Sequence, residues 1–167
     1  MTVEARAAPA ASRLREAMQA RDHAAVVALF SPDIVLHSPI LGVRFEGKGA
    51  LSDLYAGIIE GFTDYRYTRE LEGQGEHLLG FEGTVRGRRV EGVDIVRTGA
   101  DGLISEMTIM IRPLSGLIAF LVGIGPLIAR RRGRGHELAL RVLGAPLPLV
   151  AALVDLVSPR LVTLRRR

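Results

Sequence analysis

The chain of 167 residues contains no cysteine and no tryptophan, and its aromatic residues make up only 5% of the total. Without cysteine, disulfide bonds, thiolate metal ligands and a cysteine nucleophile are excluded. The four histidines show no metal-ligand spacing, and no glycine-rich phosphate loop follows a strand pattern. We therefore expect no metal ion and no other cofactor. No apolar run precedes the first charges, so no secretory signal is expected and the predicted location is the cytoplasm.

Charge is distributed unevenly along the chain. Residues 1–112 carry 13 lysines and arginines against 16 acidic residues, whereas residues 113–167 carry 9 arginines against 2 acidic residues. A basic tail is typical of nucleic-acid binding, but Phe120 is the only aromatic residue in this tail, so platforms for base stacking are missing. The sequence thus indicates an acidic body with a basic, apolar tail, and no nucleic-acid partner.

The hydrophobic spacing separates a helical beginning from a strand-rich middle. Residues 1–11 are alanine-rich and are predicted to be loose. The patterns then predict a helix from Ser12 to about Arg21, a short helix over 23–30, a strand over 33–39, a loop over 40–49 and a third helix up to Phe62. After Phe62 the period changes to two, and four strands follow with turns at "EGQGE", "RGRR" and "TGADG". This order favours an α+β fold with helices on one face of a curved antiparallel sheet.

The last two predicted strands are apolar on both faces. In "LISEMTIMI", residues 103–111, large apolar side chains occupy both odd and even positions. A sheet with one solvated face would alternate more cleanly. The second face is therefore expected to meet another subunit, a third layer or the tail, and a homodimer through the sheet is the expected assembly.

The ordered pattern over residues 12–113 resembles the SnoaL-like members of the nuclear-transport-factor-2-like superfamily, distant relatives of the ketosteroid isomerases. The resemblance lies in two helices, the strand "DIVLHSP", a glycine-led third helix and a four-strand meander ending in "RP". It implies a cone-shaped α+β barrel in which the N-terminal helices close one end and the concave sheet face lines an apolar pocket. Residues 12–113 would form this cone domain, and residues 114–167 an apolar, arginine-rich helical extension.

The ketosteroid isomerases allow a comparison residue by residue. Their general-base aspartate, the third place of "V-E-D-P", corresponds to Ser38 in "LHSP", and their oxyanion tyrosine falls on Leu14. Only the aspartate of their "D-x-x-R" strand is matched, by Asp94 in "DIVR". The resemblance implies that Asp94 points into the pocket and argues against steroid isomerase chemistry in that form. The alternative is an edge aspartate paired with Arg97 or Arg112.

Two residues are the candidates for acid–base chemistry. An Asp94 surrounded by apolar side chains would have a raised pKa, like the protonated carboxylic acid of ketosteroid isomerase, and could act as an acid or hydrogen-bond donor. His37 is the candidate base, because a neutral imidazole accepts a proton near pH 7. Strand neighbours point to opposite faces, so His37 and Ser38 cannot both face inward without a bulge. A surface or interface histidine is the alternative.

Four further residues are candidates for the pocket wall, namely Leu14, Tyr55, Glu82 and Arg112. Each has a simpler explanation as well. Tyr55 fits a core position, Glu82 fits a solvated face, and Arg112 could pair with Asp94 or Glu106. The ligand itself is predicted to be a small, mostly apolar molecule.

The tail contains two uncharged apolar segments, residues 114–129 and 142–154. A membrane-spanning helix needs about 20 apolar residues, and prolines at 126, 146 and 148 interrupt these shorter segments. We expect the tail to cover the cone or a partner subunit. The alternative is an apolar hairpin lying on a membrane surface, with its arginines facing anionic lipid.

Two functions remain open from the sequence. The first is an enzyme of the isomerase, cyclase or hydrolase type, with Asp94 as acid or donor and His37 as base. The second is a non-catalytic ligand-binding or dimerisation module. The two are distinguished by whether Asp94 and His37 converge on a common cavity.

Overall fold

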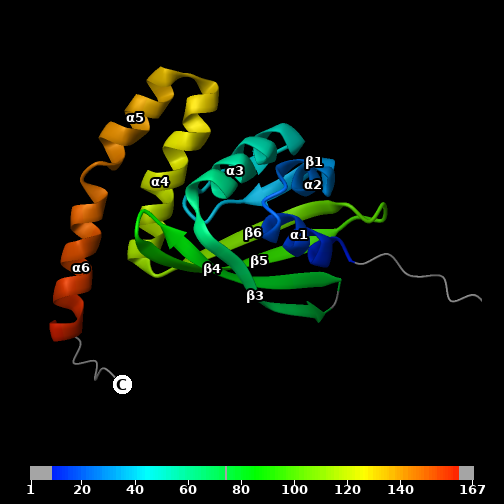
Figure 1. Cartoon of the computed structure of the whole chain (residues 1–167), viewed down its shortest axis with the longest axis horizontal. Coiled ribbons are helices and arrows are strands. Elements are labelled where there is room, and N and C mark those ends of the chain that lie inside the picture. Colours follow the sequence, from blue (N-terminus) through cyan, green and yellow to red (C-terminus); the bar gives the residue numbers. More distant parts are fainter. Residues whose placement is uncertain (1–8, 74, 162–167) are drawn as a thin grey trace, which may run out of the picture.

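The computed structural model describes residues 9–73 and 75–161 (Figure 1). The elements follow in the order α1 (Ala10–Gln19), α2 (His23–Ala28), β1 (Phe30–His37), β2 (Arg44–Glu46), α3 (Lys48–Gly61), β3 (Thr63–Gly73), β4 (Glu76–Val85), β5 (Arg88–Thr98), β6 (Ile104–Arg112), α4 (Leu114–Arg132), α5 (Arg134–Gly144) and α6 (Leu147–Leu161). The predicted α+β fold is confirmed: helices α1 to α3 cover one face of a curved sheet, and three helices follow the last strand (Figure 1).

Several local predictions differ from the structure. The helix predicted over 23–30 ends at Ala28, and the strand predicted over 33–39 begins at Phe30 and ends at His37. The first helix begins at Ala10, and the Ser12 hydroxyl donates to Glu70 (2.6 Å) instead of capping this helix. Most of the segment predicted to be loose, residues 1–8, lies outside the described residues. The loop predicted over residues 40–49 contains the three-residue strand β2, which pairs antiparallel with the end of β1.

All six strands form one sheet in the order β2-β1-β6-β5-β4-β3. Neighbouring strands are antiparallel except β1 and β6, which run parallel, because the long connection through α3 and the meander brings β6 back beside β1. Alternation along β5 buries Val90, Asp94 and Val96 on the concave face, under the helices. The intervening positions of β5, Val93 and Ile95 among them, face the convex side.

An aromatic cluster fills the concave side of the sheet. The Phe62 ring lies edge-on to Phe81 and Phe120, with ring centroids 6.4 and 6.1 Å apart, and Tyr65 stacks on Phe81 at 5.4 Å. Such pairs add to the apolar burial that stabilises the core. Because Phe120 belongs to α4, the first helix after the cone is part of the same core.

Helix α4 packs closely against the cone. A Cβ at Gly116 would lie 2.7 Å from the Arg89 carbonyl oxygen, and one at Gly61 would lie 2.8 Å from an Ile124 side-chain carbon. Glycine at these positions therefore allows the backbones of α4, β5 and α3 to approach one another. The tail thus covers the cone through α4.

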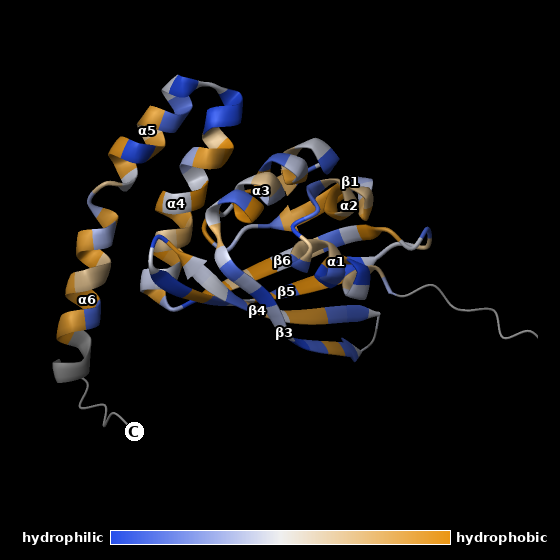
Figure 2. Cartoon of the chain, viewed as in Figure 1, coloured by the Kyte–Doolittle hydropathy of each residue, from blue (hydrophilic) through white to orange (hydrophobic). Residues whose placement is uncertain are grey.

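Helices α5 and α6 run back along α4 (Figure 1). Much of their ribbon carries the colour of hydrophobic residues (Figure 2), and large apolar side chains on them are exposed. These are Leu138, Val142, Leu143, Leu149, Val150, Leu153, Val154 and Leu156. By length and composition alone, α4 and the stretch Arg134–Val157 could each cross a membrane. Core helices of soluble proteins pass the same test, and α4 packs on the cone.

Candidate functional site

Asp94 lies near the middle of β5 on the concave face, opposite Ile109 of β6. Its side chain is 2% exposed, and the Tyr67 hydroxyl donates a hydrogen bond of 2.7 Å to its Oδ2 atom. Burial raises the pKa of Asp94 from 3.8 to about 7, because a desolvated carboxylate is disfavoured, while the hydrogen bond from Tyr67 lowers it in part. Near neutral pH this carboxyl can therefore hold or release a proton.

The same buried environment also changes the pKa of the Tyr67 hydroxyl. Burial, and then the neighbouring Asp94 charge, raise the pKa of Tyr67 well above 10, so this hydroxyl stays protonated and remains a donor. Together the two side chains form the Asp94–Tyr67 pair, a polar group set in an aromatic environment. Sequence reasoning missed Tyr67, although its two-residue spacing from Tyr65 in "YRYTREL" places both rings on one face of the strand.

A small cavity of 10 Å³ adjoins Asp94 of this pair, and we call it the floor cavity. Aromatic side chains surround it, namely Tyr55, Phe62, Tyr65, Phe81 and Phe120. This volume is about that needed for one water molecule. In this conformation, the Asp94 carboxyl has no room beside it for an organic ligand.

A much larger apolar space of 400 Å³, which we call the outer cavity, lies next to the floor cavity. It is half open, and the end of β1, the loop after it, α3, α4 and α5 line it with mostly apolar side chains, including Leu36, Phe45, Leu54, Ile128, Ala129 and Leu140. Ile109 and Phe120 line both cavities. These two side chains therefore separate the outer cavity from the Asp94–Tyr67 pair.

Few polar side chains line the outer cavity. The Ser38 hydroxyl accepts hydrogen bonds from the amides of Ile40 (3.2 Å) and Leu41 (3.1 Å), so it stabilises the turn after β1. Arg132 and His136 are the only titratable residues in the lining, and both are exposed to solvent at its rim. No sequence motif pointed to His136, because only the fold brings the α4–α5 junction to the end of β1.

The structure places the two apolar pocket candidates inside the molecule. Tyr55 is 1% exposed, lines the floor cavity and donates a hydrogen bond to the Met107 sulfur (2.8 Å). Leu14 is fully buried in the core and lines neither of the two cavities. Leu14 is thus a core residue and not part of either cavity wall.

His37 lies on the opposite face of the sheet from Asp94. Leu36 faces the outer cavity, so the next residue, His37, points to the convex face, where its Nε2 atom lies 2.9 Å from a Glu106 carboxylate oxygen. The prediction that His37 and Asp94 share a cavity is therefore wrong. The strand ends in regular alternation, and no bulge turns His37 inward.

Glu82 and Arg112 also lie on the convex face, outside the cone. Glu82 forms ion pairs with Arg66 and Arg89, and Arg112 lies 3.4 Å from Glu91. The prediction that these two residues line the concave pocket is wrong, because their strand neighbours Phe81 and Ile111 take the inward positions. They border a 720 Å³ hollow on the convex face, in which Glu82, Arg89, Glu91 and Arg112 form ion pairs with one another. Arg69 also lines this hollow and has no ion pair among the described residues.

Within residues 9–73 and 75–161, no group of three or more histidine or carboxylate side chains could hold a metal ion. The concave site instead offers hydrogen bonding, proton transfer at Asp94 and apolar contact. The fold is a curved sheet of six strands whose concave face is covered by helices, with an apolar cavity between them. This places the protein in the class of cone-shaped α+β folds.

Comparison with known proteins identifies the family. Residues 11–107 match the family model of the SnoaL-like domain, and the chain belongs to this family. It is 31% identical to a steroid delta-isomerase from Pseudomonas aeruginosa, with a TM-score of 0.64 and coverage of 75% of this chain and 92% of that one. Among curated proteins, none matches the chain.

Two further solved structures share the fold. A protein with a cystatin-like fold from Silicibacter pomeroyi has 22% identity and a TM-score of 0.67, covering 80% of this chain and 92% of that chain. A putative SnoaL-like polyketide cyclase from Shewanella denitrificans has 10% identity and a TM-score of 0.52, covering 62% and 88%. Residues 1–112 make up about two thirds of this chain, so the Pseudomonas and Silicibacter matches extend into the tail.

Proposed function

We propose that the protein binds a small, mostly apolar molecule in the outer cavity. The observation that carries this proposal is a half-open space of 400 Å³ with almost wholly apolar walls. Ligand pockets span roughly 300–1,000 Å³ and combine apolar walls with a few polar groups. The 31% identity to a steroid delta-isomerase supports an apolar ligand of modest size.

The Asp94–Tyr67 pair supports a second candidate function, in which a ligand carbonyl is polarised at the floor of the cone. A protonated Asp94 can donate a hydrogen bond into the floor cavity, while the Tyr67 hydroxyl donates to the Asp94 carboxyl and holds it in place. A donor aimed at a developing oxyanion stabilises it strongly in a dry site. The ligand would reach Asp94 only after Phe120 rotates away. No histidine or second carboxylate lines the floor cavity, so the geometry supports binding better than isomerisation.

Thermal shift with a panel of apolar ketones, alcohols and steroid enones tests the binding function. A ligand at 100 times its dissociation constant should add about 2.7 kcal/mol to the free energy of unfolding. Ala129→Leu fills part of the outer cavity and should weaken binding at least tenfold. The matched control Ala152→Leu adds the same side chain on α6, outside the lining. Absence of any stabilising ligand, or equal loss in both variants, would overturn the proposal.

The catalytic candidate needs a separate assay. Isomerisation of a β,γ-unsaturated ketone produces a conjugated ketone that absorbs in the ultraviolet, and its formation can be followed directly. Turnover that is lost in both Asp94→Asn and Tyr67→Phe would support catalysis at the floor. If the unaltered protein binds the ketone but does not convert it, the catalytic candidate is contradicted and only the binding function is supported.

A further inference from the structure

Three consecutive arginines end α4, and they differ in their partners. Arg130 pairs with Glu60 (3.1 Å) and Arg131 lies 3.8 Å from Asp53, so both are held by carboxylates of α3. Arg132 has no acidic partner among the residues that the structure describes, and it lines the outer cavity. The third arginine therefore leaves its positive charge available at the cavity rim.

The break between α4 and α5 brings a second polar side chain to this rim. Gly133 has a φ of +135°, which L side chains rarely adopt, and its amide donates to the carbonyls of Ala129 (3.2 Å) and Arg130 (3.2 Å). The chain thus ends one helix and starts the next within a single residue. Arg132 and His136, one on each side of the break, consequently border the same cavity.

We propose that the ligand of the outer cavity is a single-chain anionic amphiphile, such as a medium-chain carboxylate. Its apolar body would occupy the cavity, and Arg132 and His136 would bind its anionic head group at the rim. This inference rests on the proposed binding function and adds the chemical class of the ligand.

Solvation and hydrogen bonding favour a ligand whose apolar body lies in the cavity and whose charged head group lies at the rim. A charge buried among the apolar walls would lose its hydration without compensation, whereas a carboxylate at the rim keeps water and gains a charge-assisted hydrogen bond. The planar guanidinium of arginine can bind a carboxylate through two hydrogen bonds, and an imidazole N–H supplies a further donor. A volume of 400 Å³ is well below that of a two-chain lipid, which favours a free single-chain molecule.

Calorimetric titration with decanoate and with decan-1-ol tests the head-group assignment, because the two ligands differ in charge but share the same chain length. The unaltered protein should bind decanoate about tenfold more tightly than decan-1-ol. Arg132→Gln should remove about tenfold of the decanoate affinity and leave the decan-1-ol affinity unchanged, and His136→Gln should act in the same direction. Circular dichroism checks that both variants fold.

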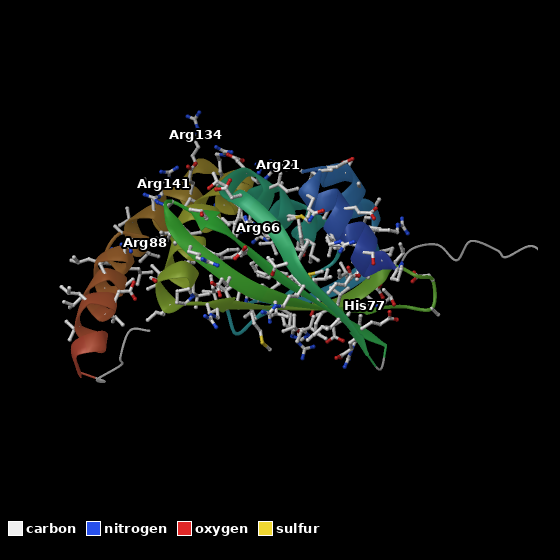
Figure 3. All side chains as sticks on the ribbon, turned by 60° about the horizontal axis from the view of Figure 1, so that its bottom comes forward. Arg21, Arg66, His77, Arg88, Arg134 and Arg141 are labelled. Carbon is white, nitrogen blue, oxygen red and sulfur yellow. The ribbon has the colours of Figure 1, made fainter. Side chains whose placement is uncertain are left out.

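Arg134→Gln is the matched control for charge. Arg134 follows the same helix break but points away from the molecule (Figure 3), and it is not part of the cavity lining. Its substitution should leave both affinities unchanged. Equal weakening of decanoate binding by Arg134→Gln and Arg132→Gln would reveal only general charge attraction and overturn the assignment.

The remaining outcomes separate this inference from the proposed function. Equal affinity for decanoate and decan-1-ol in the unaltered protein would contradict the anionic head group while leaving the apolar cavity as a binding site. Weakening of both ligands by Arg132→Gln would assign Arg132 a structural role and also contradict the inference. Failure of every ligand to bind, in this titration and in the thermal-shift panel, would overturn the proposed function itself.

Discussion

Asp94 makes the folded protein sensitive to pH because its carboxyl is buried. Its pKa is about 7 in the folded protein and near 3.8 in the unfolded chain. Between these values the unfolded chain releases this proton while the folded protein keeps it. The free energy of unfolding should therefore fall as pH rises from about 4 to 7, by an amount on the order of 4 kcal/mol.

Asp94→Asn should remove this pH dependence, since an amide does not titrate. Urea denaturation of both proteins at several pH values measures the effect, and all other titrating groups are shared. The stability of the unaltered protein relative to the variant should decline between pH 4 and pH 8. A difference that stays constant over this range would show that Asp94 does not titrate as described.

Removing the hydrogen bond from Tyr67 to Asp94 should change both the pKa of Asp94 and the stability of the protein. Tyr67→Phe removes a donor that favours the ionised carboxylate, so the pKa of Asp94 should rise above its present value. The variant should also lose about 1–3 kcal/mol of stability, because a buried acceptor loses its partner. Carbon-13 NMR of the Asp94 carboxyl, titrated in both proteins, gives the pKa directly. An unchanged or lowered value would contradict the hydrogen bond.

The burial of Asp94 could be anticipated from the sequence, and the position of His37 could not. Apolar neighbours and the "DIVR" resemblance both pointed Asp94 inward, as the structure has it. Alternation shows that His37 and Ser38 face opposite ways, but it does not say which of them faces inward at the end of a strand. Glu82 was misplaced for the same reason: the sequence does not show which of two neighbouring residues faces inward, and here it is Phe81.

The docking of α4 depends on the absence of a side chain at Gly116. Gly116→Ala would place a Cβ atom 2.7 Å from the Arg89 carbonyl oxygen, so helix and strand must move apart. This overpacking should lower the free energy of unfolding by about 1–3 kcal/mol. Gly49→Ala on α3 is the control, since an added Cβ there meets no atom within 4 Å. It should be neutral or raise stability by up to about 1 kcal/mol.

Urea denaturation measures both glycine variants. Equal stability of Gly116→Ala and Gly49→Ala would contradict the close packing of α4 on β5. The sequence indicated a covering role for the tail, but it gave no sign that Phe120 would complete the floor of the cone. That contact depends on how α4 crosses the sheet, which is a tertiary property without a local sequence pattern.

The convex face of the sheet is the surface through which we predict self-association. Met110 is 56% exposed there, and Val93 and Ile95 are half-buried beside it. Apolar groups of this kind often mark interfaces. Analytical ultracentrifugation should show a dimer at micromolar concentrations, and Met110→Glu should shift it toward monomer. A monomer at high micromolar concentration in the unaltered protein would contradict this prediction.

The exposed apolar side chains of α5 and α6 form a second candidate contact surface for the whole molecule. Arg132 and Arg134, which have no acidic partner among the described residues, lie next to it in the chain, and exposed apolar groups beside arginines favour anionic membrane surfaces. We predict that the protein sediments with phosphatidylglycerol vesicles at low salt and is released as salt rises. Leu149→Glu combined with Leu153→Glu should reduce the bound fraction. Absence of vesicle binding at low salt would leave the tail with its covering role.

The outer cavity as a ligand site is the central claim, and methyl NMR with a neutral ligand tests it most directly. Decan-1-ol added to protein labelled at its isoleucine and leucine methyl groups should give saturable shifts at Leu54, Ile128 and Leu140, which line the cavity. Intermolecular contacts between the ligand and these same methyl groups should accompany the shifts. Shifts confined to exposed α6 residues such as Leu149 and Leu153, or no saturable shift at all, would contradict the account.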